Sequence, residues 1–178
     1  APSCCRRARA RRPRVRRPRK PDTDAAEADE RTVRTAALAL LAGRDFGRAE
    51  LARRLERRGY PAGVVAAVLE GLVAERLLSE SRFVEQFVGQ HARRGHGPAR
   101  IRAELRERGV ADAEIDAGLD AAAEDWTSRA REVRRRRFGV SPPGDYAERA
   151  RQARFLQYRG FSNEQIRAAL GPGEDIDP

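Results

Sequence analysis

Three short phrases, spaced evenly along the chain, have the same form: "LERRGY" at 55–60, "LRERGV" at 105–110 and "LQYRGF" at 156–161. In each phrase a leucine stands four residues before the glycine, and an apolar residue directly follows the glycine. Apolar residues also stand six and ten positions after each glycine. These later residues are Val65, Ile115 and Ile166, then Leu69, Leu119 and Leu170. The chain therefore contains an internal repeat with a period of 50 to 51 residues.

Each phrase has the spacing of a helix that ends in a Schellman cap. In that cap a left-handed glycine stands at C′, and the residues at C3 and C″ make a hydrophobic contact. In the first phrase these positions fall on Gly59, Leu55 and Tyr60. Signals for a new helix follow at once: Pro61 in the first repeat, Asp112 as a predicted N-cap in the second, and Ser162 with Gln165 as a predicted capping box in the third. Each phrase is therefore predicted to be a helix, a tight turn and a second helix.

A further amphipathic helix is predicted before each pair. Apolar residues recur with helical spacing within 33–41, 83–91 and 126–133, and no stretch alternates as a strand does. The predicted fold class is all-α, with three tandem three-helix repeats in an elongated, curved body. We place the repeats at 31–78, 79–125 and 126–170. An Arg/Pro-rich tail and acidic linker (1–30) precede them, and an acidic C-terminal tail (171–178) follows.

The formal net charge of +10 originates in the first 20 residues. Residues 1–20 hold nine arginines, Lys20 and no acid, whereas residues 21–178 hold 27 basic and 27 acidic residues. A segment of this composition cannot bury a core, so the tail is predicted to be disordered. Within the body, residues 126–170 hold 11 basic residues against four acidic ones. The basic tail and the basic third repeat make a polyanion a candidate partner.

The residues that enzymes commonly need are scarce. Lys20 is the only lysine, so the chain has no G-x-x-x-x-G-K-[ST] nucleotide loop and no suitable Schiff-base lysine. His91 and His96 are the only histidines and have no cysteine nearby, and His91 continues an apolar helix face, so we expect it to be a packed residue. We therefore predict that the protein is not an enzyme, with no catalytic, cofactor-binding or metal-binding residues and no cofactor.

The cellular location is predicted from sequence features that are absent. The adjacent Cys4 and Cys5 offer no disulfide framework, which fits a reducing compartment. No apolar run approaches the roughly 20 residues of a membrane span, and no apolar segment follows the first arginines as in a secretory signal. We expect a cytoplasmic protein that does not enter membranes.

The helix before each turn carries arginines on its outward flanks, and the first helix of the third repeat adds more. These arginines are the candidate residues for contact with a partner or with nucleic acid. They are Arg53 and Arg57 in the first repeat, Arg100, Arg102 and Arg106 in the second, and Arg134, Arg135, Arg136, Arg151 and Arg154 in the third. The alternative is a solvated arginine-rich surface that binds nothing.

A competing hypothesis is a helix-turn-helix transcription regulator, which would read DNA with the helix after each turn. That helix should expose Arg, Lys, Asn or Gln. In the first repeat, residues 61–74 include no basic residue, and in the second, residues 111–125 hold six acidic residues and no basic one. Only "SNEQIRAAL" (162–170) in the third repeat has suitable groups. Groove reading by the first two repeats is therefore electrostatically unfavourable.

Several motifs, in their order and spacing, resemble the RecX family of recombination regulators. They are "ALALLAGRDFGRAELARRLERRGYP" (37–61), "LLSESRFVEQFV" (77–88), "RRGHGPARIRAELRERGV" (93–110) and "RFLQYRGFSNEQI" (154–166). The family usually has two acids before the x-Arg-Phe of the second repeat, whereas this chain has Ser79 and Glu80. The resemblance covers about 31–170.

The resemblance implies three tandem three-helix repeats that lodge in the groove of a RecA recombinase filament. Such a protein limits filament growth or promotes disassembly, and so restrains strand exchange in homologous recombination, DNA repair and the SOS response. It is not an enzyme. On this basis we expect a monomer that contacts single-stranded DNA weakly or through the filament.

Overall fold

The computed structural model describes residues 23–171, so the basic tail (1–20), which is predicted to be disordered, and residues 172–178 of the acidic C-terminal tail lie outside the described residues. Within it the chain forms helices and no strand. The helices are α1 (Thr23–Leu41), α2 (Arg48–Glu56), α3 (Ala62–Ala74), α4 (Glu80–Arg93), α5 (Pro98–Arg108), α6 (Asp112–Ala121), α7 (Trp126–Phe138), α8 (Tyr146–Tyr158) and α9 (Asn163–Leu170). The all-α prediction is confirmed, and no helix in the described part of the chain is both long and apolar enough to cross a membrane.

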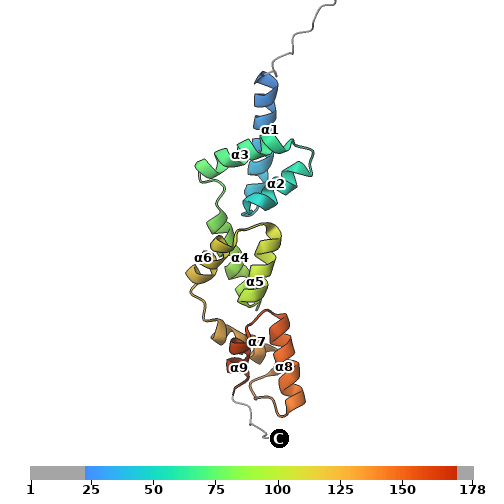
Figure 1. Ribbon diagram of the computed structural model, residues 1–178, viewed down its shortest axis with the longest axis vertical. Coiled ribbons are helices and arrows are strands. Elements are labelled where there is room, and N and C mark those ends of the chain that lie inside the picture. Colours follow the sequence, from blue (N-terminus) through green and yellow to red (C-terminus); the bar gives the residue numbers. More distant parts are fainter. Residues whose placement is uncertain (1–22, 172–178) are drawn as a thin grey trace, which may run out of the picture.

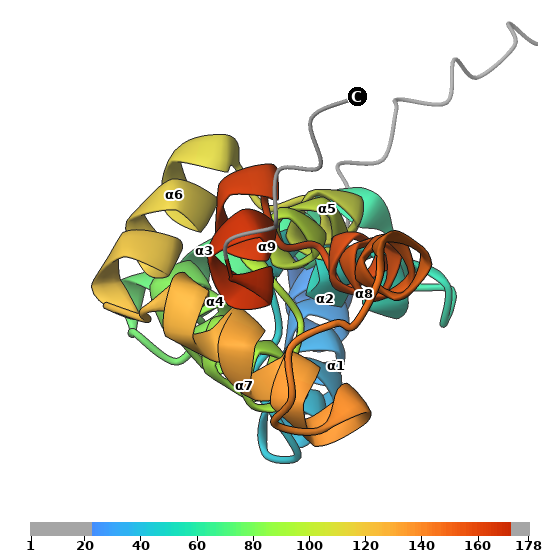
Figure 2. The same ribbon diagram turned by 90° about the horizontal axis from the view of Figure 1, so that it is seen from below.

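The helices are grouped in threes along the long axis of the molecule (Figure 1). We call α1–α3 the first unit, α4–α6 the second and α7–α9 the third. Each unit has a hydrophobic cluster of its own, and in the view along the long axis the units overlap (Figure 2). The body is therefore elongated, with its core divided among the units.

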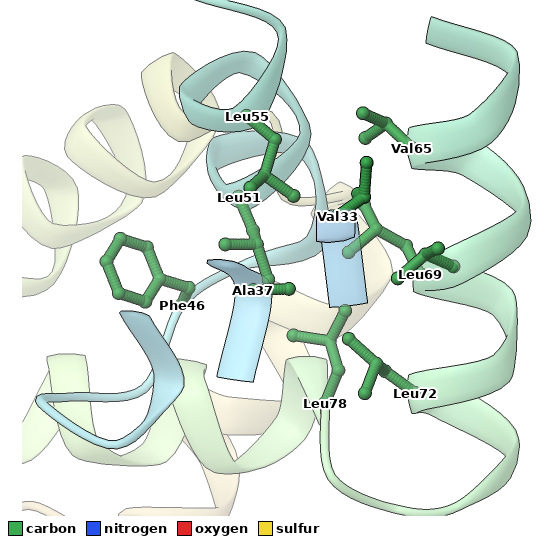
Figure 3. Close-up of a cluster of buried hydrophobic side chains, with 10 residues drawn as sticks. Val33, Ala37, Phe46, Leu51, Leu55, Val65, Leu69, Leu72 and Leu78 are labelled. Atoms are coloured by element: carbon green, nitrogen blue, oxygen red, sulfur yellow. The ribbon is translucent and has the colours of Figure 1, made fainter. Parts of the chain in front are cut away.

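The first unit shows how a repeat builds its core. Val33 and Ala37 of α1 meet Leu51 and Leu55 of α2 and Leu69 of α3, and each of these side chains is almost fully buried (Figure 3). Residues of the connecting segments close the ends of this cluster. The apolar positions that the repeat aligned are buried in all three units, except that Tyr60 is partly buried and packs against the first cluster.

The three predicted Schellman caps are confirmed. Gly59, Gly109 and Gly160 have φ of 92°, 88° and 90°. In the first cap the Tyr60 amide donates to the Leu55 carbonyl at 3.5 Å, and the corresponding bonds in the other two measure 3.2 Å. The capping box of α9 is also present as predicted.

Neighbouring units are joined at these turns. The Arg53 guanidinium of α2 donates to the carbonyl of Arg108 at 2.6 Å, beside the turn of the second unit. One unit further on, the Gly97 amide donates to the Arg159 carbonyl at 2.8 Å and the Ala99 amide to the Gly160 carbonyl at 3.1 Å. The turn of each later unit is therefore seated against the second helix of the unit before it.

Two local expectations differ from the structure. Helix α1 begins at Thr23 and so includes most of the acidic segment expected to be a linker. Alanine and acidic residues suit the start of a helix, because alanine has high helix propensity and negative charge complements the helix dipole. Asp112 lies at the first helical position rather than at the N-cap, which is Ala111, and its carboxylate accepts from Arg106 at 2.6 Å.

The departure at Ser79 is accommodated by capping. Its hydroxyl is the N-cap of α4 and accepts from the Arg82 amide at 3.3 Å. Serine caps a helix about as well as aspartate does. The loss of an acid at this position therefore leaves the start of α4 intact.

Candidate functional site

The third unit brings the end of α7 beside α8. Asp125 caps the start of α7, where its carboxylate accepts from the amides of Thr127 and Ser128, both at 3.0 Å. The helix ends at Phe138, because Gly139 and the segment "GVSPPG" leave helical geometry. Asp145 then caps α8 by accepting from the Glu148 amide at 2.7 Å. These caps set where the two helices begin.

A shallow cleft of about 450 Å³ lies between these helices, lined by Arg137, Phe138, Glu148, Arg151 and Phe155. We call these five residues the α7–α8 cleft. Phe138 and Phe155 meet edge to face, with ring centroids 5.3 Å apart. Both rings are partly exposed.

Arginines surround the two rings. The guanidinium carbons of Arg151 and Arg137 lie 5.5 and 5.7 Å from the Phe138 centroid, and that of Arg159 lies 5.2 Å from the Phe155 centroid. Glu148 is the only acid in the lining, and its carboxylate is 3.5 Å from Arg151. Cations over exposed aromatic rings form a surface that can hold a phosphate and stack a base or another planar group.

Arg134, predicted on the surface of the third unit, is instead buried, with 6 % of its area exposed. Its Nε donates to Gln152 Oε1 at 2.9 Å, and its Nη2 donates to the Ser141 carbonyl. The prediction of an exposed Arg134 was wrong, because the residue lies on the face of α7 that packs against α8 and the loop between them.

The other predicted arginines of the third unit are exposed but do not share one face. Arg151 and Arg154 lie one turn apart on α8. Arg136 pairs with Glu132 at 2.5 Å, and Arg135 lines a separate hollow next to α9. In the described part of the chain neither Arg135 nor Arg154 has a carboxylate within ion-pair distance. Among the exposed arginines of the predicted set in this unit, these two are the ones without an ion pair.

The predicted arginines of the second unit are paired. Arg100 contacts Glu104 at 2.9 Å, Arg102 contacts Asp116 at 2.6 Å, and Arg106 contacts Asp112 at 2.6 Å. The hydrogen bond from Arg106 holds the pKa of Asp112 below its ordinary value. Because α6 supplies acids to α5, little net positive charge is left on this surface.

In the first unit the two predicted arginines have different surroundings. Arg53 donates to the carbonyls at the end of α5, where cations suit the helix dipole, so it has a role at the joint. Arg57 is exposed at the end of α2. No ion pair involves Arg57 within residues 29–171.

A larger hollow of about 860 Å³ lies between the first and second units. Its walls are mainly apolar residues of α2 and α3, and charges of both signs line its rim. They are Arg48, Arg76 and Arg82 with Glu56, Glu80 and Glu114. Its mixed charge does not favour a polyanion, unlike the α7–α8 cleft.

Phe138, Phe155 and Arg137 were not among the residues predicted for contact with a partner. A usable signal does exist. "RRF" at 136–138 and "RQARF" at 151–155 each end in a phenylalanine near an arginine, just before and after a helix-breaking loop. Such pairs meet only if the two helices pack against each other with these faces together, which the repeat alone did not specify.

Comparison with known families gives a consistent result along the whole described body. Residues 34–72 match the family described as "RecX, first three-helix domain". Residues 79–119 match "RecX, second three-helix domain", and residues 123–170 match "RecX, third three-helix domain".

Individual proteins agree. A "Regulatory protein RecX" of Halorhodospira halophila is 52 % identical over 152 residues, which is 85 % of this chain and 94 % of that protein. One of Pseudomonas syringae pv. tomato is 46 % identical over 144 residues, covering 80 % of this chain and 93 % of that protein.

Two solved structures share the fold. "Crystal structure of RecX from Lactobacillus salivarius" has a TM-score of 0.68 at 18 % identity, covering 79 % of this chain and 93 % of that chain. "Crystal structure of regulatory protein RecX" has a TM-score of 0.67 at 20 % identity, covering 79 % of this chain and 71 % of that one.

Proposed function

The chain belongs to the RecX family of regulatory proteins, and we propose that it binds the RecA recombinase filament and inhibits its assembly or activity. Its effect would be to restrain homologous recombination, DNA repair and the SOS response. The observation that carries the proposal is the match of all three units, in order, to the three-helix domains of one regulatory family.

The shape and charge of the body are compatible with this role. Three units arranged along one axis give a long, narrow molecule, which suits a groove between filament subunits (Figure 1). A RecA filament carries DNA, so a binding protein meets both protein surface and phosphates. The α7–α8 cleft offers arginines and partly exposed rings for the phosphates and bases. We therefore assign contact with single-stranded DNA in the filament to the third unit.

The helix-turn-helix alternative has no support from the helices that would read the groove. Helix α3 has no basic residue and α6 begins with acidic residues. In α9, the one helix with suitable groups, the Gln165 side chain is used in the capping box and Arg167 Nε donates to the Asn163 carbonyl at 3.4 Å. These contacts leave few groups to reach a base edge, so we do not propose sequence-specific DNA reading.

The test is ATP hydrolysis by a RecA recombinase on single-stranded DNA while this protein is added. We expect hydrolysis and strand exchange to fall as the protein saturates the filament. If both stay unchanged at saturation, the proposed function is wrong.

A pair of matched variants then locates the contact. Arg137→Gln with Arg151→Gln removes two charges from the α7–α8 cleft, and Arg34→Gln with Arg58→Gln removes two from the first unit. We expect the cleft variant to need a several-fold higher concentration for half inhibition and the other to act as the parent protein does. Equal inhibition by the two variants would remove the cleft from the proposal while leaving the regulatory function in place.

A further inference from the structure

A fourth phrase of the repeated form ends α4: "HARRGH" at 91–96 matches "LERRGY" at 55–60. The backbone is the same as well. Gly95 has φ of 78°, its amide donates to the Ala92 carbonyl at 2.9 Å, and the His96 amide donates to the His91 carbonyl at 3.0 Å. His91 therefore occupies C3 and His96 occupies C″ of a Schellman cap, the two positions whose side chains touch. Two imidazoles meet where the other phrases place apolar side chains.

The contact between the rings is made through nitrogen atoms. Nδ1 of His91 and Nδ1 of His96 are 3.0 Å apart. Oε2 of Glu104, on α5, lies 3.4 Å from His91 Nδ1. One atom from each of these three residues lies within 4.8 Å of the others. A carboxylate from a second helix thus completes a triangle with the two ring nitrogens.

Neighbouring groups hold two members of the triangle in place. The His91 ring stacks on Phe87, with centroids 3.9 Å apart, and is buried. Arg100 donates to the other carboxylate oxygen of Glu104, Oε1, at 2.9 Å, which leaves Oε2 turned toward His91. Ring orientation and carboxylate orientation are therefore set before any ligand arrives.

We propose that His91, His96 and Glu104 bind a divalent transition metal ion, with Zn²⁺ the best match, and that water takes the fourth position. Zn²⁺ favours imidazole and carboxylate ligands at about 2.0–2.2 Å in a tetrahedron, so its ligand atoms stand about 3.3 Å apart. The observed separations of 3.0 and 3.4 Å lie close to this value. Three protein ligands with one open position is an arrangement that zinc commonly adopts.

The charges around the site weaken the binding of a metal ion. Four arginines surround the rings and repel a dication, namely Arg94, Arg100, Arg108 and Arg159. We therefore expect reversible binding rather than a permanent structural ion.

The site lies next to the contact between the second and third units. His96 directly precedes Gly97, whose amide donates to Arg159 at the joint with the third unit. An ion at His91, His96 and Glu104 would link α4, α5 and the loop that carries this joint. Bound metal should then stabilise the contact between the second and third units.

The test is titration of the full chain with Zn²⁺ and with Co²⁺, whose visible absorption reports tetrahedral nitrogen and oxygen ligands. Cys4 and Cys5 are replaced by serine throughout, so that thiolates do not compete for the metal. We expect Zn²⁺ to raise the thermal midpoint in a concentration-dependent way, since a ligand of the folded state stabilises it.

Glu104→Gln and His96→Gln are the ligand variants, because both side chains are only partly buried and can be changed without opening the core. Each should lower Zn²⁺ affinity by about tenfold or more, since losing even a supporting partner of a ligand costs about 10–100-fold. Glu107→Gln, an exposed neighbour with the same charge change, is the matched control and should bind as the parent does.

Either of two results would rule out the proposed metal site. One is Zn²⁺ affinity in Glu104→Gln and His96→Gln equal to that of the parent. The other is a Co²⁺ complex without tetrahedral absorption. His91→Asn is not needed for this decision, because His91 is buried against Phe87 and its loss would also disturb packing.

Discussion

Gly97 and Gly160 lie in direct backbone contact where the second unit meets the third. A Cβ placed on Gly97 would stand 2.4 Å from the Gly160 carbonyl oxygen, and one placed on Gly160 would stand 2.5 Å from the Arg100 amide nitrogen. No side chain fits at either position, so this joint depends on two glycines for its close approach. Gly160 has two functions there, because its φ of 90° also ends α8.

The first prediction separates these two functions of glycine. Gly59→Ala should cost only the strain of a left-handed residue, about 1–2 kcal/mol, because no atom lies within 4 Å of the added carbon. Gly160→Ala should cost clearly more, because it adds a collision with the Arg100 backbone to the same strain. Urea unfolding of both variants, followed by circular dichroism, measures the difference.

Gly97→Ala is the companion variant, since the φ of Gly97 is −87° and the substitution brings collision without strain. It should also be less stable than the parent protein. Equal stabilities for Gly59→Ala and Gly160→Ala would mean that the third unit is not seated against the second as described.

The turn glycines differ in how much of their environment can be predicted from the sequence. The phrase "LQYRGF" predicted the cap at Gly160, because a cap is a property of six consecutive residues. The collision with Arg100 was not predictable, because it depends on how one unit is placed on another. For the same reason Gly59, Gly109 and Gly160 appeared equivalent in sequence and are not equivalent in packing.

The second prediction concerns Arg134. Arg134→Met should destabilise the third unit by about 1–3 kcal/mol, because the buried Gln152 loses the donor to its Oε1. Arg135→Met, one position along α7 and exposed, should change stability by no more than about 0.5 kcal/mol. Thermal and urea unfolding of the two variants provide the test. A neutral Arg134→Met would show that the pair with Gln152 contributes nothing to the fold.

The misplacement of Arg134 has a physical cause. Arginine is seldom buried unless it is paired, so a run of four arginines is most simply assigned to solvent. The partner that allows burial, Gln152, lies on the next helix, and the Ser141 carbonyl lies in the loop between them. A local sequence pattern predicts which face of a helix is buried. It does not predict a hydrogen-bond partner on the next helix, because the path of the intervening loop does not follow from the sequence.

The third prediction is a loss of stability in acid through Asp125. Hydrogen bonds from Ser128 and from the Thr127 amide hold the pKa of this N-cap carboxyl below its ordinary value of 3.8. The folded state therefore favours the charged form, so the stabilisation is complete above that value and is lost as the pH falls through the lower folded pKa. We expect the thermal midpoint to drop as the pH is lowered from about 5 toward 2.

Asp125→Asn isolates this charge, because asparagine caps a helix about as well as aspartate does. The variant should show a shallower acid dependence than the parent. The pKa of Glu80 is shifted in the opposite direction from that of Asp125. Because burial raises this pKa in the folded state, the contribution of Glu80 to stability declines as the pH rises from its ordinary pKa through the higher folded pKa. An unchanged acid profile in Asp125→Asn would assign the acid sensitivity to other carboxyls.

The last prediction distinguishes the tail from the third unit as the source of polyanion affinity. Residues 1–20 carry ten basic residues and no acid, so their contacts with phosphates should be sequence-independent and should weaken as salt rises. Each phosphate that the tail neutralises adds about 0.7 to the salt slope on single-stranded DNA. Deletion of residues 1–20 should therefore weaken binding to bare DNA and flatten its salt dependence. Inhibition of RecA should largely survive, because the helical units match the family domains without the tail.

Removal of positive charge from the third unit should have the opposite effect to deletion of the tail. Arg135, Arg136, Arg151 and Arg154 are exposed on α7 and α8, so replacing them by glutamine should leave the helical circular dichroism unchanged. Because Arg151 lines the α7–α8 cleft and Arg154 lies one turn away on the same helix, the loss should reduce inhibition of RecA more than it reduces binding to bare DNA. Binding titrations at several salt concentrations, with the ATPase assay beside them, resolve the two effects. If tail deletion abolishes inhibition and the four substitutions leave it intact, the working surface lies in residues 1–20 and the cleft is a structural feature of the third unit.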